Sequence, residues 1–177
     1  IVNNSSLTVE HCFFINNDAD DYGGGIYVNN SSPTLRFCTI NDNDAYHGGG
    51  LYCTNGSNPT LTNCFFNDNE ATYFGGGMFI RGGSSTLTNC YFEGNHISRF
   101  DYSPDEQGGG LYNYLSRAEL NNCHFTDNYA EANGGGVYNG CDSPSQFQSC
   151  TFTSNDSDYG AGVYNLDSSP PFPDCVF

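Results

Sequence analysis

A unit of about 26 residues recurs along the whole chain, and this repeat constrains the fold more than any other feature. Seven cysteines keep the period, namely Cys12, Cys38, Cys64, Cys90, Cys123, Cys150 and Cys175. Glycine triplets that start at Gly23, Gly48, Gly75, Gly108 and Gly134 keep the same period. Such self-similarity is the signature of a repeat architecture. We divide the single domain into coils 1–25, 26–50, 51–77, 78–110, 111–136, 137–162 and a partial coil 163–177.

Each unit repeats the same order of apolar, polar and glycine positions. An apolar residue stands three places before the cysteine, and another, mostly Phe, stands two places after it. An Asn follows five places after the cysteine; an acidic turn, the glycines and an aliphatic–aromatic pair come next. No stretch keeps a helical period, and short β-type segments alternate with turn residues. The sequence therefore predicts an all-β fold, a β-solenoid of about 6.5 coils.

Stacking of the coils predicts ladders of equivalent side chains about 4.8 Å apart. The cysteines and the column from Phe14 to Phe177 are expected to face the core, together with the aliphatic residues after the glycines. The Asn of each unit is expected to bond its own copies and the backbone of the turn. The glycines are expected to allow a positive φ or a close backbone approach where the coil bends.

Alternation along the strand places the next aromatic residue of each unit on the opposite, outer face. This outer aromatic row consists of Tyr27, Tyr52, Phe79, Tyr112, Tyr138 and Tyr164. An exposed strip of rings with polar tips can stack on sugar rings or pack against another chain, so the row is a candidate binding site. The preferred interpretation is that the rings stack on one another and simply cover the sheet.

These columns resemble the repeats of polymorphic outer-membrane-protein-type adhesins, which alternate a Phe-x-x-Asn motif with a Gly-Gly-aliphatic motif. The first motif stands here as Phe14-Ile15-Asn16-Asn17, Phe66-Asn67-Asp68-Asn69, Phe92-Glu93-Gly94-Asn95, Phe125-Thr126-Asp127-Asn128 and Phe152-Thr153-Ser154-Asn155. Ile40 replaces Phe in the second coil. The resemblance covers essentially the whole chain and implies a right-handed, single-stranded parallel β-helix. It implies less about function, because such helices also carry polysaccharide lyases, tailspikes and surface proteins.

The charge balance excludes several classes of partner. Lys and Arg total 4 against 20 Asp and Glu, no Lys occurs, and the formal net charge is −16. Such a chain cannot neutralise a run of phosphates, which argues against nucleic acid and against an anionic membrane surface. No apolar run approaches the length of a membrane-spanning helix, so direct membrane insertion is not expected either.

The cysteine count leaves three interpretations of the ladder. Of the nine cysteines, Cys53 and Cys141 lie outside it, and an odd number means that at least one cannot pair within the chain. No Cys-x-x-Cys pair occurs, although metal sites usually need such clustering. Stacked structural thiols are the preferred interpretation; some disulfide content and a metal column remain as alternatives.

Acidic side chains precede the glycines in every coil that has a complete turn. Asp18, Asp42 and Asp68 are candidate Ca²⁺ ligands, since Ca²⁺ takes six to eight oxygens. The preferred alternative is a solvated acidic edge that maintains solubility and blocks lateral pairing of sheets. No other cofactor is expected.

No catalytic residue is assigned. Lys is absent, the four histidines share no column, and Arg36 and Arg81 occupy different positions of the repeat. An enzyme is therefore not favoured. The fourth coil is about seven residues longer than the others, and insertions in solenoids map to surface loops that often bind ligands. Arg99, Asp101 and Asp105 in this inserted loop are candidate binding residues, but a tolerated insertion is the preferred interpretation.

Acceptor patterns for N-glycosylation occur at Asn4, Asn30, Asn55 and Asn155, among others. Together with the acidity and the turn-rich composition, they favour an extracellular or cell-surface protein.

Two hypotheses about function follow. The preferred one is a non-enzymatic structural β-helix, either a fibre subunit or an adhesin stalk. The alternative is a carbohydrate-active β-helix, similar to a polysaccharide lyase or hydrolase, or a glycan-binding module. Neither end of the chain carries an evident cap, because residues 1–6 repeat a segment that follows the glycines and residues 172–177 supply the next rungs. Three interpretations follow: copies associate end to end into filaments, the chain belongs to a longer array, or the protein is a capped monomer.

Overall fold

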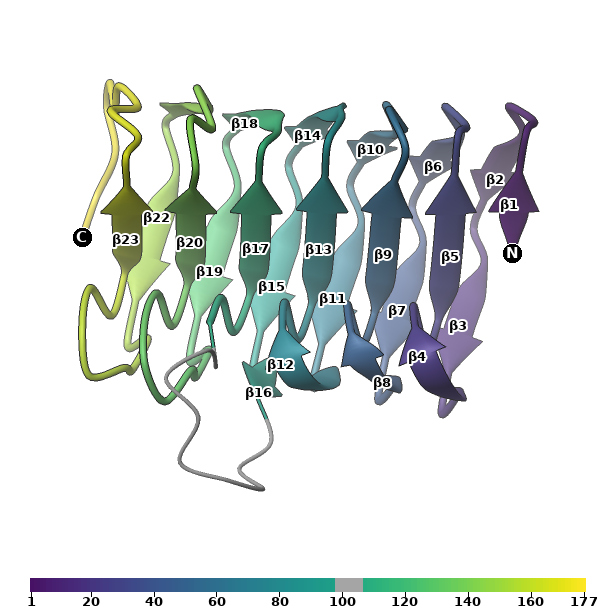
Figure 1. Cartoon of the computed structure of the whole chain (residues 1–177), viewed down its shortest axis with the longest axis horizontal. Helices are drawn as coiled ribbons and strands as arrows, with labels where there is room; N and C mark the ends of the chain where they lie inside the picture. The colour runs from purple at the N-terminus through teal and green to yellow at the C-terminus, as the bar shows by residue number, and fades with distance from the viewer. Residues whose placement is uncertain (98–106) are drawn as a thin grey trace.

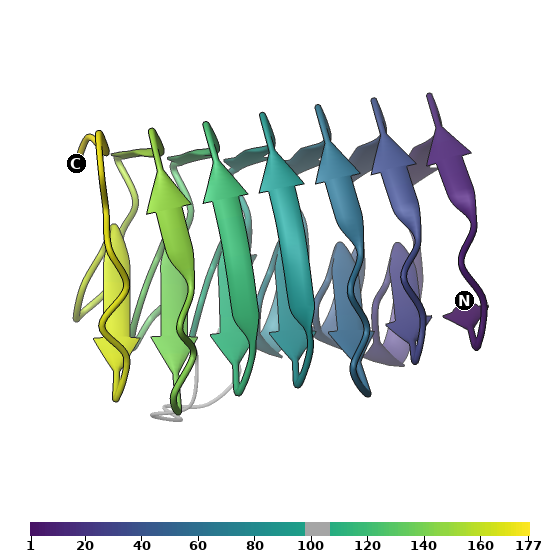
Figure 2. The ribbon, with the colours of Figure 1, turned by 90° about the horizontal axis from the view of Figure 1, so that it is seen from above.

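The computed structural model describes residues 1–97 and 107–177. All regular secondary structure in these residues is β-strand. Successive coils stack side by side along one axis and form an elongated solenoid (Figures 1 and 2). The predicted all-β solenoid is confirmed. In the described part of the chain, no helix is long and apolar enough to cross a membrane.

Four parallel sheets run along the axis, and most coils add one strand to each. Sheet A contains β1 (Val2–Asn3), β5 (Ile26–Asn29), β9 (Leu51–Thr54), β13 (Met78–Arg81), β17 (Leu111–Tyr114), β20 (Val137–Gly140) and β23 (Val163–Leu166). Sheet B contains β2 (Thr8–Glu10), β6 (Thr34–Arg36), β10 (Thr60–Thr62), β14 (Ser84–Thr88), β18 (Arg117–Asn121) and β21 (Gln146–Gln148). Sheet C contains β3 (Phe13–Ile15), β7 (Thr39–Asn41), β11 (Phe65–Asn67), β15 (Tyr91–Glu93), β19 (His124–Thr126) and β22 (Thr151–Thr153). Sheet D contains β4 (Asp18–Tyr22), β8 (Asp44–His47), β12 (Glu70–Phe74) and β16 (His96–Ile97).

The register joins each residue to its equivalent one coil away, so the repeat columns of the sequence become ladders. Phe66 of β11 pairs with Ile40 of β7 on one side and with Phe92 of β15 on the other. The ring centroids of Phe66 and Phe92 lie 4.7 Å apart, and those of Phe92 and Phe125 lie 4.8 Å apart. The predicted ladder spacing is confirmed for these rings.

The coil closes because the backbone turns through left-handed corners between the sheets. In the second coil, the corners are Asn30, Phe37, Asp42 and Gly48, with φ values of 46°, 53°, 51° and 63°. Asn and Asp tolerate this conformation better than other non-glycine residues, because their short polar side chains bond locally. The abundance of Asn and Asp in the turns is thus a requirement of the fold.

The glycine triplets serve both of the predicted purposes. The first glycine of each triplet has a positive φ, as at Gly48. The third permits a close backbone approach, because a Cβ on Gly77 would lie only 2.6 Å from the carbonyl oxygen of Gly110 in the next coil. The triplets are therefore packing devices inside the solenoid.

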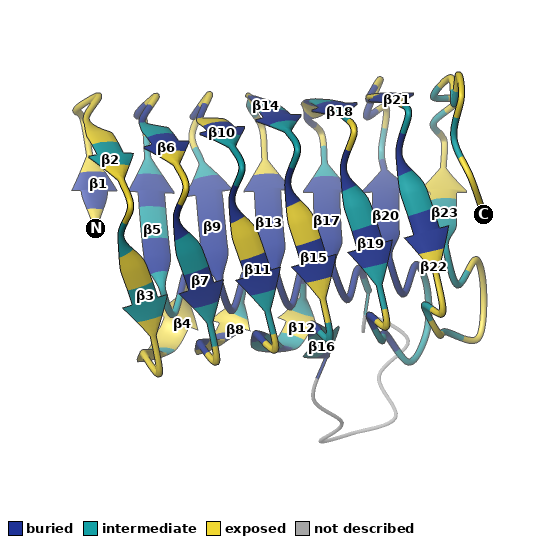
Figure 3. Ribbon diagram, turned by 180° about the vertical axis from the view of Figure 1, so that it is seen from behind, coloured by how far each residue is buried: buried dark blue, intermediate teal, exposed yellow. Residues whose placement is uncertain are grey.

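The interior of the solenoid is filled by the predicted apolar and thiol ladders. Phe66, Phe92, Phe125, Leu51 and Met78 are buried, and so are Cys38, Cys64, Cys90, Cys123 and Cys150. At the ends of the chain the ladders become more exposed: Cys12 and Cys175 are half-buried and Phe177 is 69% exposed. Figure 3 shows the same gradient: β3 and β23 contain no buried residue, whereas central strands such as β11, β13 and β15 do.

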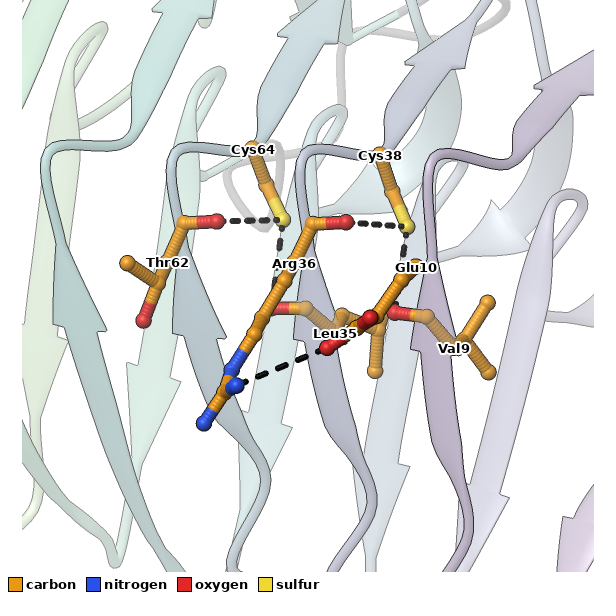
Figure 4. A network of polar contacts seen from close by, with 7 residues as sticks. All are labelled: Val9, Glu10, Leu35, Arg36, Cys38, Thr62 and Cys64. Carbon is orange, nitrogen blue, oxygen red and sulfur yellow. Dashed lines mark hydrogen bonds and ion pairs between the residues drawn. The ribbon is translucent and has the colours of Figure 1, made fainter.

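The thiols of the cysteine ladder bond to backbone carbonyls. Cys64 Sγ lies 3.6 Å from the carbonyl oxygen of Leu35 and 3.5 Å from that of Thr62, and Cys38 makes the equivalent pair of contacts with Val9 and Arg36 (Figure 4). All nine cysteines are free thiols in the structure. The ladder therefore matches the interpretation of stacked structural thiols.

Asparagines form a second continuous ladder at the corner between sheets C and D. Asn43 and Asn69 are buried, and Asn43 Nδ2 donates hydrogen bonds to Asn69 Oδ1 (2.9 Å) and to the carbonyl oxygen of Phe14 (2.9 Å). The same pattern continues through Asn95, Asn128 and Asn155. The predicted bonding of each Asn to its copies and to the turn backbone is confirmed.

Candidate functional site

The outer aromatic row lies on the outer face of sheet A, as alternation predicted, but its predicted exposure is wrong for the four central rings. Tyr52, Phe79, Tyr112 and Tyr138 are between 3% and 6% exposed, whereas the end residues Tyr27 and Tyr164 are half-buried. The rings of the row contact one another, with centroid distances from 4.7 Å for Phe79–Tyr112 to 5.7 Å for Tyr27–Tyr52. Mutual stacking is one cause of their burial.

A second aromatic column, absent from the sequence prediction, is the other cause. It consists of the residue immediately before the glycine triplet, which is Tyr22, His47 and Phe74 in three successive coils. The ring centroid of Tyr22 lies 4.7 Å from that of Tyr52, and the centroid of Phe74 lies 4.7 Å from that of Tyr112. The left-handed first glycine turns the chain from sheet D to sheet A, which brings this column against the row.

A cleft of about 300 Å³ remains between the two columns. It lies where Phe79 interrupts the stack, because this ring stands at 82° to Tyr52 and at 85° to Tyr112. Arg81 and Tyr114, which are register partners on β13 and β17, complete the lining. The cleft therefore combines flat apolar rings with one guanidinium.

Burial and the neighbouring cation set the charge states in the cleft. Burial, followed by the positive charge of Arg81, lowers the pKa of His47, so the ring is neutral at pH 7. His47 Nδ1 is buried and has no hydrogen-bond partner. Burial raises the pKa of Tyr52, while Arg81 acts in the opposite direction, and burial raises the pKa of Tyr138 to about 12. Arg81 is thus the positive group of the cleft and lies near a neutral His47.

The three Ca²⁺ candidates do not share one column. Asp18 pairs with Asp44 and Glu70 along sheet D, whereas Asp42 and Asp68 occupy the preceding left-handed corner. Among residues 1–97 and 107–177, no group of three or more His, Cys, Asp or Glu side chains is arranged to hold a metal ion. The structure thus places Asp18 in one column and Asp42 and Asp68 in another.

The acidic column of sheet D has its own electrostatics. Burial, followed by the negative charges of Glu70 and Asp18, raises the pKa of Asp44. His96 at the end of this column places Nε2 3.1 Å from Glu70 Oε2. Three carboxylates thus lie next to one another in this column, and a histidine contacts only the last of them, Glu70.

The remaining sequence candidates are dispersed over the molecule. Arg36 lies on β6 of sheet B and pairs with Glu10 at 3.4 Å (Figure 4), so it is not on the same sheet as Arg81. The inserted-loop candidates Arg99, Asp101 and Asp105 lie outside the described residues.

The glycosylation candidates fall into two environments. Asn4, Asn30 and Asn55 are exposed and form one column of left-handed corners after β1, β5 and β9. Asn155 belongs to the asparagine ladder instead, where its Nδ2 donates to the carbonyl oxygen of Phe125 at 2.8 Å. The first three side chains are thus better placed to be modified.

Comparison with known proteins agrees with this geometry. A family model described as a right handed beta helix region matches residues 1–177. No curated protein matches the chain. Among solved structures, QnrB1, described as a plasmid-mediated fluoroquinolone resistance protein, is 12% identical, with 96% of this chain and 93% of that chain covered and a TM-score of 0.18. A TM-score this low does not show that the two structures share a fold.

Proposed function

The chain belongs to the right-handed β-helix family, and from that premise we propose that it is a non-enzymatic structural rod whose copies join end to end as a fibre subunit. The observation that supports the proposal is the constant register of the coils. Each strand edge and each apolar rung pairs with its equivalent one coil away, so a coil of a second copy can continue the same ladders. A surface with this pattern matches another coil of the same kind.

At the first coil, Phe14 and Cys12 are half-buried, whereas Ile40 and Cys38 of the next coil are 0% exposed. At the last coil, Cys175 is half-buried and Phe177 is exposed, although its ring stacks on Phe152 at 4.9 Å. Both end coils also present a parallel strand edge, which can pair with a further strand.

A second copy of this chain is the occupant that we propose for these surfaces. Its first coil places Cys12 and Phe14 over Cys175 and Phe177 of the preceding copy, which continues both ladders in register. The contact joins two different surfaces, so it is heterologous and repeats without closing into a ring. Further coils of the same chain would cover these surfaces by the same contacts.

Charge sets the conditions for this association. The net charge of −16 repels a second copy, and salt screens that repulsion. Association is therefore expected to strengthen as the salt concentration rises.

The proposal includes an extracellular or cell-surface location, in which the rod acts as a fibre or as an adhesin stalk. The exposed corner column Asn4, Asn30 and Asn55 supports it, since these acceptor side chains face solvent. Expression in secretory cells, followed by glycosidase treatment and mass measurement, tests this part. Failure of the wild-type chain to gain glycosidase-sensitive mass would count against it.

Two end variants test the association. Phe14→Asp places a charge on the first coil, and Phe177→Asp places one on the last coil. Each variant keeps one intact end surface, so neither associates alone, but an equimolar mixture forms a dimer of twice the 19.2 kDa chain mass and nothing larger. Phe13→Asp is the matched control, because Phe13 precedes Phe14 on β3 and its side chain is 74% exposed.

Light scattering after size-exclusion chromatography, over a range of protein and salt concentrations, gives the masses. The wild type and Phe13→Asp are expected to grow with concentration and salt. A wild-type chain that stays monomeric at high concentration and high salt would overturn the proposal. Wild-type-like growth of Phe14→Asp or Phe177→Asp alone would overturn it as well.

A further inference from the structure

The outer face of sheet C carries aromatic rings that remain open to solvent, in contrast to the central rings on sheet A. Phe65 stacks on Tyr91 with ring centroids 5.0 Å apart, and Tyr91 stacks on His124 at 4.7 Å. Phe65 is 41% exposed and Tyr91 is 38% exposed. These two residues lie in the third and fourth coils, on β11 and β15 (Figure 3), so their exposure does not depend on the end coils.

The surface around these rings, which we call the sheet C face, follows from the three-residue strands of the sheet. The middle residue of each strand belongs to the inner phenylalanine ladder, so the first and third residues point outward. The left-handed corner before each strand adjoins them, and the sheet C face consists of these corners and the outward residues.

Phe37 adds a further ring to the sheet C face in a backbone conformation that phenylalanine rarely adopts. It stands at the corner before β7 with a φ of 53°, is 51% exposed, and stacks on His11 at 5.0 Å. The equivalent corners of the next two coils are Asn63 and Asn89, and Asn tolerates a left-handed φ better than Phe does. A strained, exposed ring where the fold accepts asparagine indicates a role in contact.

Charge also distinguishes the sheet C face from the rest of the molecule. Among the outward residues of its six strands, Glu93 is the only Asp, Glu, Lys or Arg. Asp42 and Asp68 lie at the corner after the strands and form an acidic rim. In a chain of net charge −16, the face is therefore an apolar and nearly uncharged surface with a polar rim, as protein interfaces have.

A second copy of this chain fits the sheet C face better than a partner of another kind. The rungs repeat at the strand spacing of about 4.8 Å, and another copy presents its rings at the same interval. The rings of one copy can therefore lie in the gaps between the rungs of the other. A basic partner would be drawn to the acidic surfaces instead, and an acidic partner would be repelled.

We propose that two copies pair side by side through the sheet C face. The same surface meets itself, so the contact has two-fold symmetry and closes at two copies. Six rungs about 4.8 Å apart and roughly 13 Å wide give roughly 400 Å² per copy, about half of what a stable interface buries. Pairing of single rods is therefore weak, with a dissociation constant of about 1 mM.

The contact lies on the side of the rod and is independent of the end-to-end association. In a fibre the same face would recur along the length, so many weak contacts would bundle fibres together. Only this consequence rests on the proposed function.

Phe177→Asp is the background for the test, because its altered end blocks the end-to-end contact. Sedimentation equilibrium is expected to show a monomer–dimer equilibrium with a dissociation constant of about 1 mM and no larger species. A photoreactive p-benzoylphenylalanine in place of Phe65 is expected to cross-link to sheet C of a second copy. Mass spectrometry on mixtures of isotope-labelled and unlabelled chains identifies the intermolecular products.

Two variants and a matched control in this background assign the contact. Phe65→Glu is expected to weaken pairing about tenfold or more, because it buries a charge in an apolar contact. Tyr46→Glu is the control, since it adds the same charge at a 52% exposed ring on sheet D, and it is expected to pair as the background does. Phe37→Asn is expected to weaken pairing and yet to raise the melting temperature by about 2–4 °C, because the left-handed strain is relieved.

Several results would contradict the proposal. A background chain that stays monomeric above about 1 mM at high salt would overturn it and leave the face to a different partner. Equal pairing by folded Phe65→Glu and Tyr46→Glu, or cross-links that reach only other sheets, would overturn it too. A lower melting temperature of Phe37→Asn would show that this ring serves the fold and would count against the contact. Failure of the wild type to associate end to end would not alter these outcomes, because they are measured on Phe177→Asp.

Discussion

Asn95 Oδ1 accepts two hydrogen bonds from Asn69 of the preceding coil, one from the backbone N–H at 3.1 Å and one from Nδ2 at 2.9 Å. Asn95 Nδ2 in turn donates to the carbonyl oxygen of Phe66 and to Asn128 Oδ1. One buried side chain thus satisfies backbone and side-chain groups of three coils. The asparagine column couples neighbouring coils in addition to the strand pairing.

Replacement of this side chain is expected to be costly. Asn95→Ala leaves two donors of Asn69 and two acceptors, Phe66 O and Asn128 Oδ1, without this partner in the interior, which should cost about 3 kcal/mol or more. Urea unfolding followed by circular dichroism measures the loss. Asn121→Ala, at a half-buried strand position on β18, is the control and should change stability by less than about 0.5 kcal/mol.

The close backbone approach at the glycines predicts a difference between two alanine variants. Gly77→Ala places a Cβ 2.6 Å from Gly110 O and 3.0 Å from Phe92 Cδ1. Because the first contact is with backbone, this overpacking should cost about 3 kcal/mol or more. Gly82 has φ +66° with open space around it, so Gly82→Ala should cost only the conformational penalty of about 1–2 kcal/mol. Since Gly77 does not have a positive φ, an equal or smaller loss for Gly77→Ala in thermal unfolding would contradict the steric argument.

The acidic column of sheet D predicts a pH-dependent gain in stability. Burial and the charges of Glu70 and Asp18 raise the pKa of Asp44 above its ordinary value of 3.8, so the folded state binds the proton more tightly than the unfolded state does. Above this raised pKa, the ionised carboxylate of Asp44 lowers the free energy of unfolding. This loss of stability disappears as the pH falls to 3.8, because the folded state is then protonated. Asp44→Asn should raise the melting temperature at pH 7 and lose that advantage near pH 4. Asp20→Asn is the surface control, and a pH-independent advantage of Asp44→Asn would refute the electrostatic cause.

The burial of the nine cysteines predicts two classes of thiol. Cys12, Cys141 and Cys175 are half-buried and should react with a maleimide first. The other six are buried, and burial raises the pKa of the Cys53 thiol, so these should react only on unfolding. Mass spectrometry should count nine labelled thiols in denaturant without reductant. A smaller count would reveal a disulfide.

The interior was predictable from the sequence because a constant period forces equivalent residues into one column. Leu61 and Phe66 could be placed from the cysteine spacing alone, and the pairing confirms their columns. The burial of the outer aromatic row was not predicted, since it depends on where the turn before the glycines folds back. That turn shifts register between Ala19 and Tyr22, and no periodic pattern in the sequence marks such a shift.

The signal for the second aromatic column was nevertheless present. Tyr22, His47 and Phe74 each stand directly before a glycine triplet, and Tyr159 does so in the sixth coil. Gln107 and Asn133 break the series, which hides it from a search for identical residues. The cleft itself could not be predicted, because it depends on the edge-on orientation of the Phe79 ring.

The asparagine ladder also gives the rod a chemical direction. At each step of the column, an asparagine Nδ2 donates to the Oδ1 of its copy in the coil that follows, from Asn17 to Asn155. From Asn43 onward, Nδ2 also donates to a backbone carbonyl of the preceding coil. The first coil therefore offers an acceptor oxygen and the last coil offers amide donors. Two rods brought together at their first coils would set acceptor against acceptor, whereas a first coil placed on a last coil continues the series. In the end-to-end association proposed above, the orientation of this one buried amide would set the polarity of the contact.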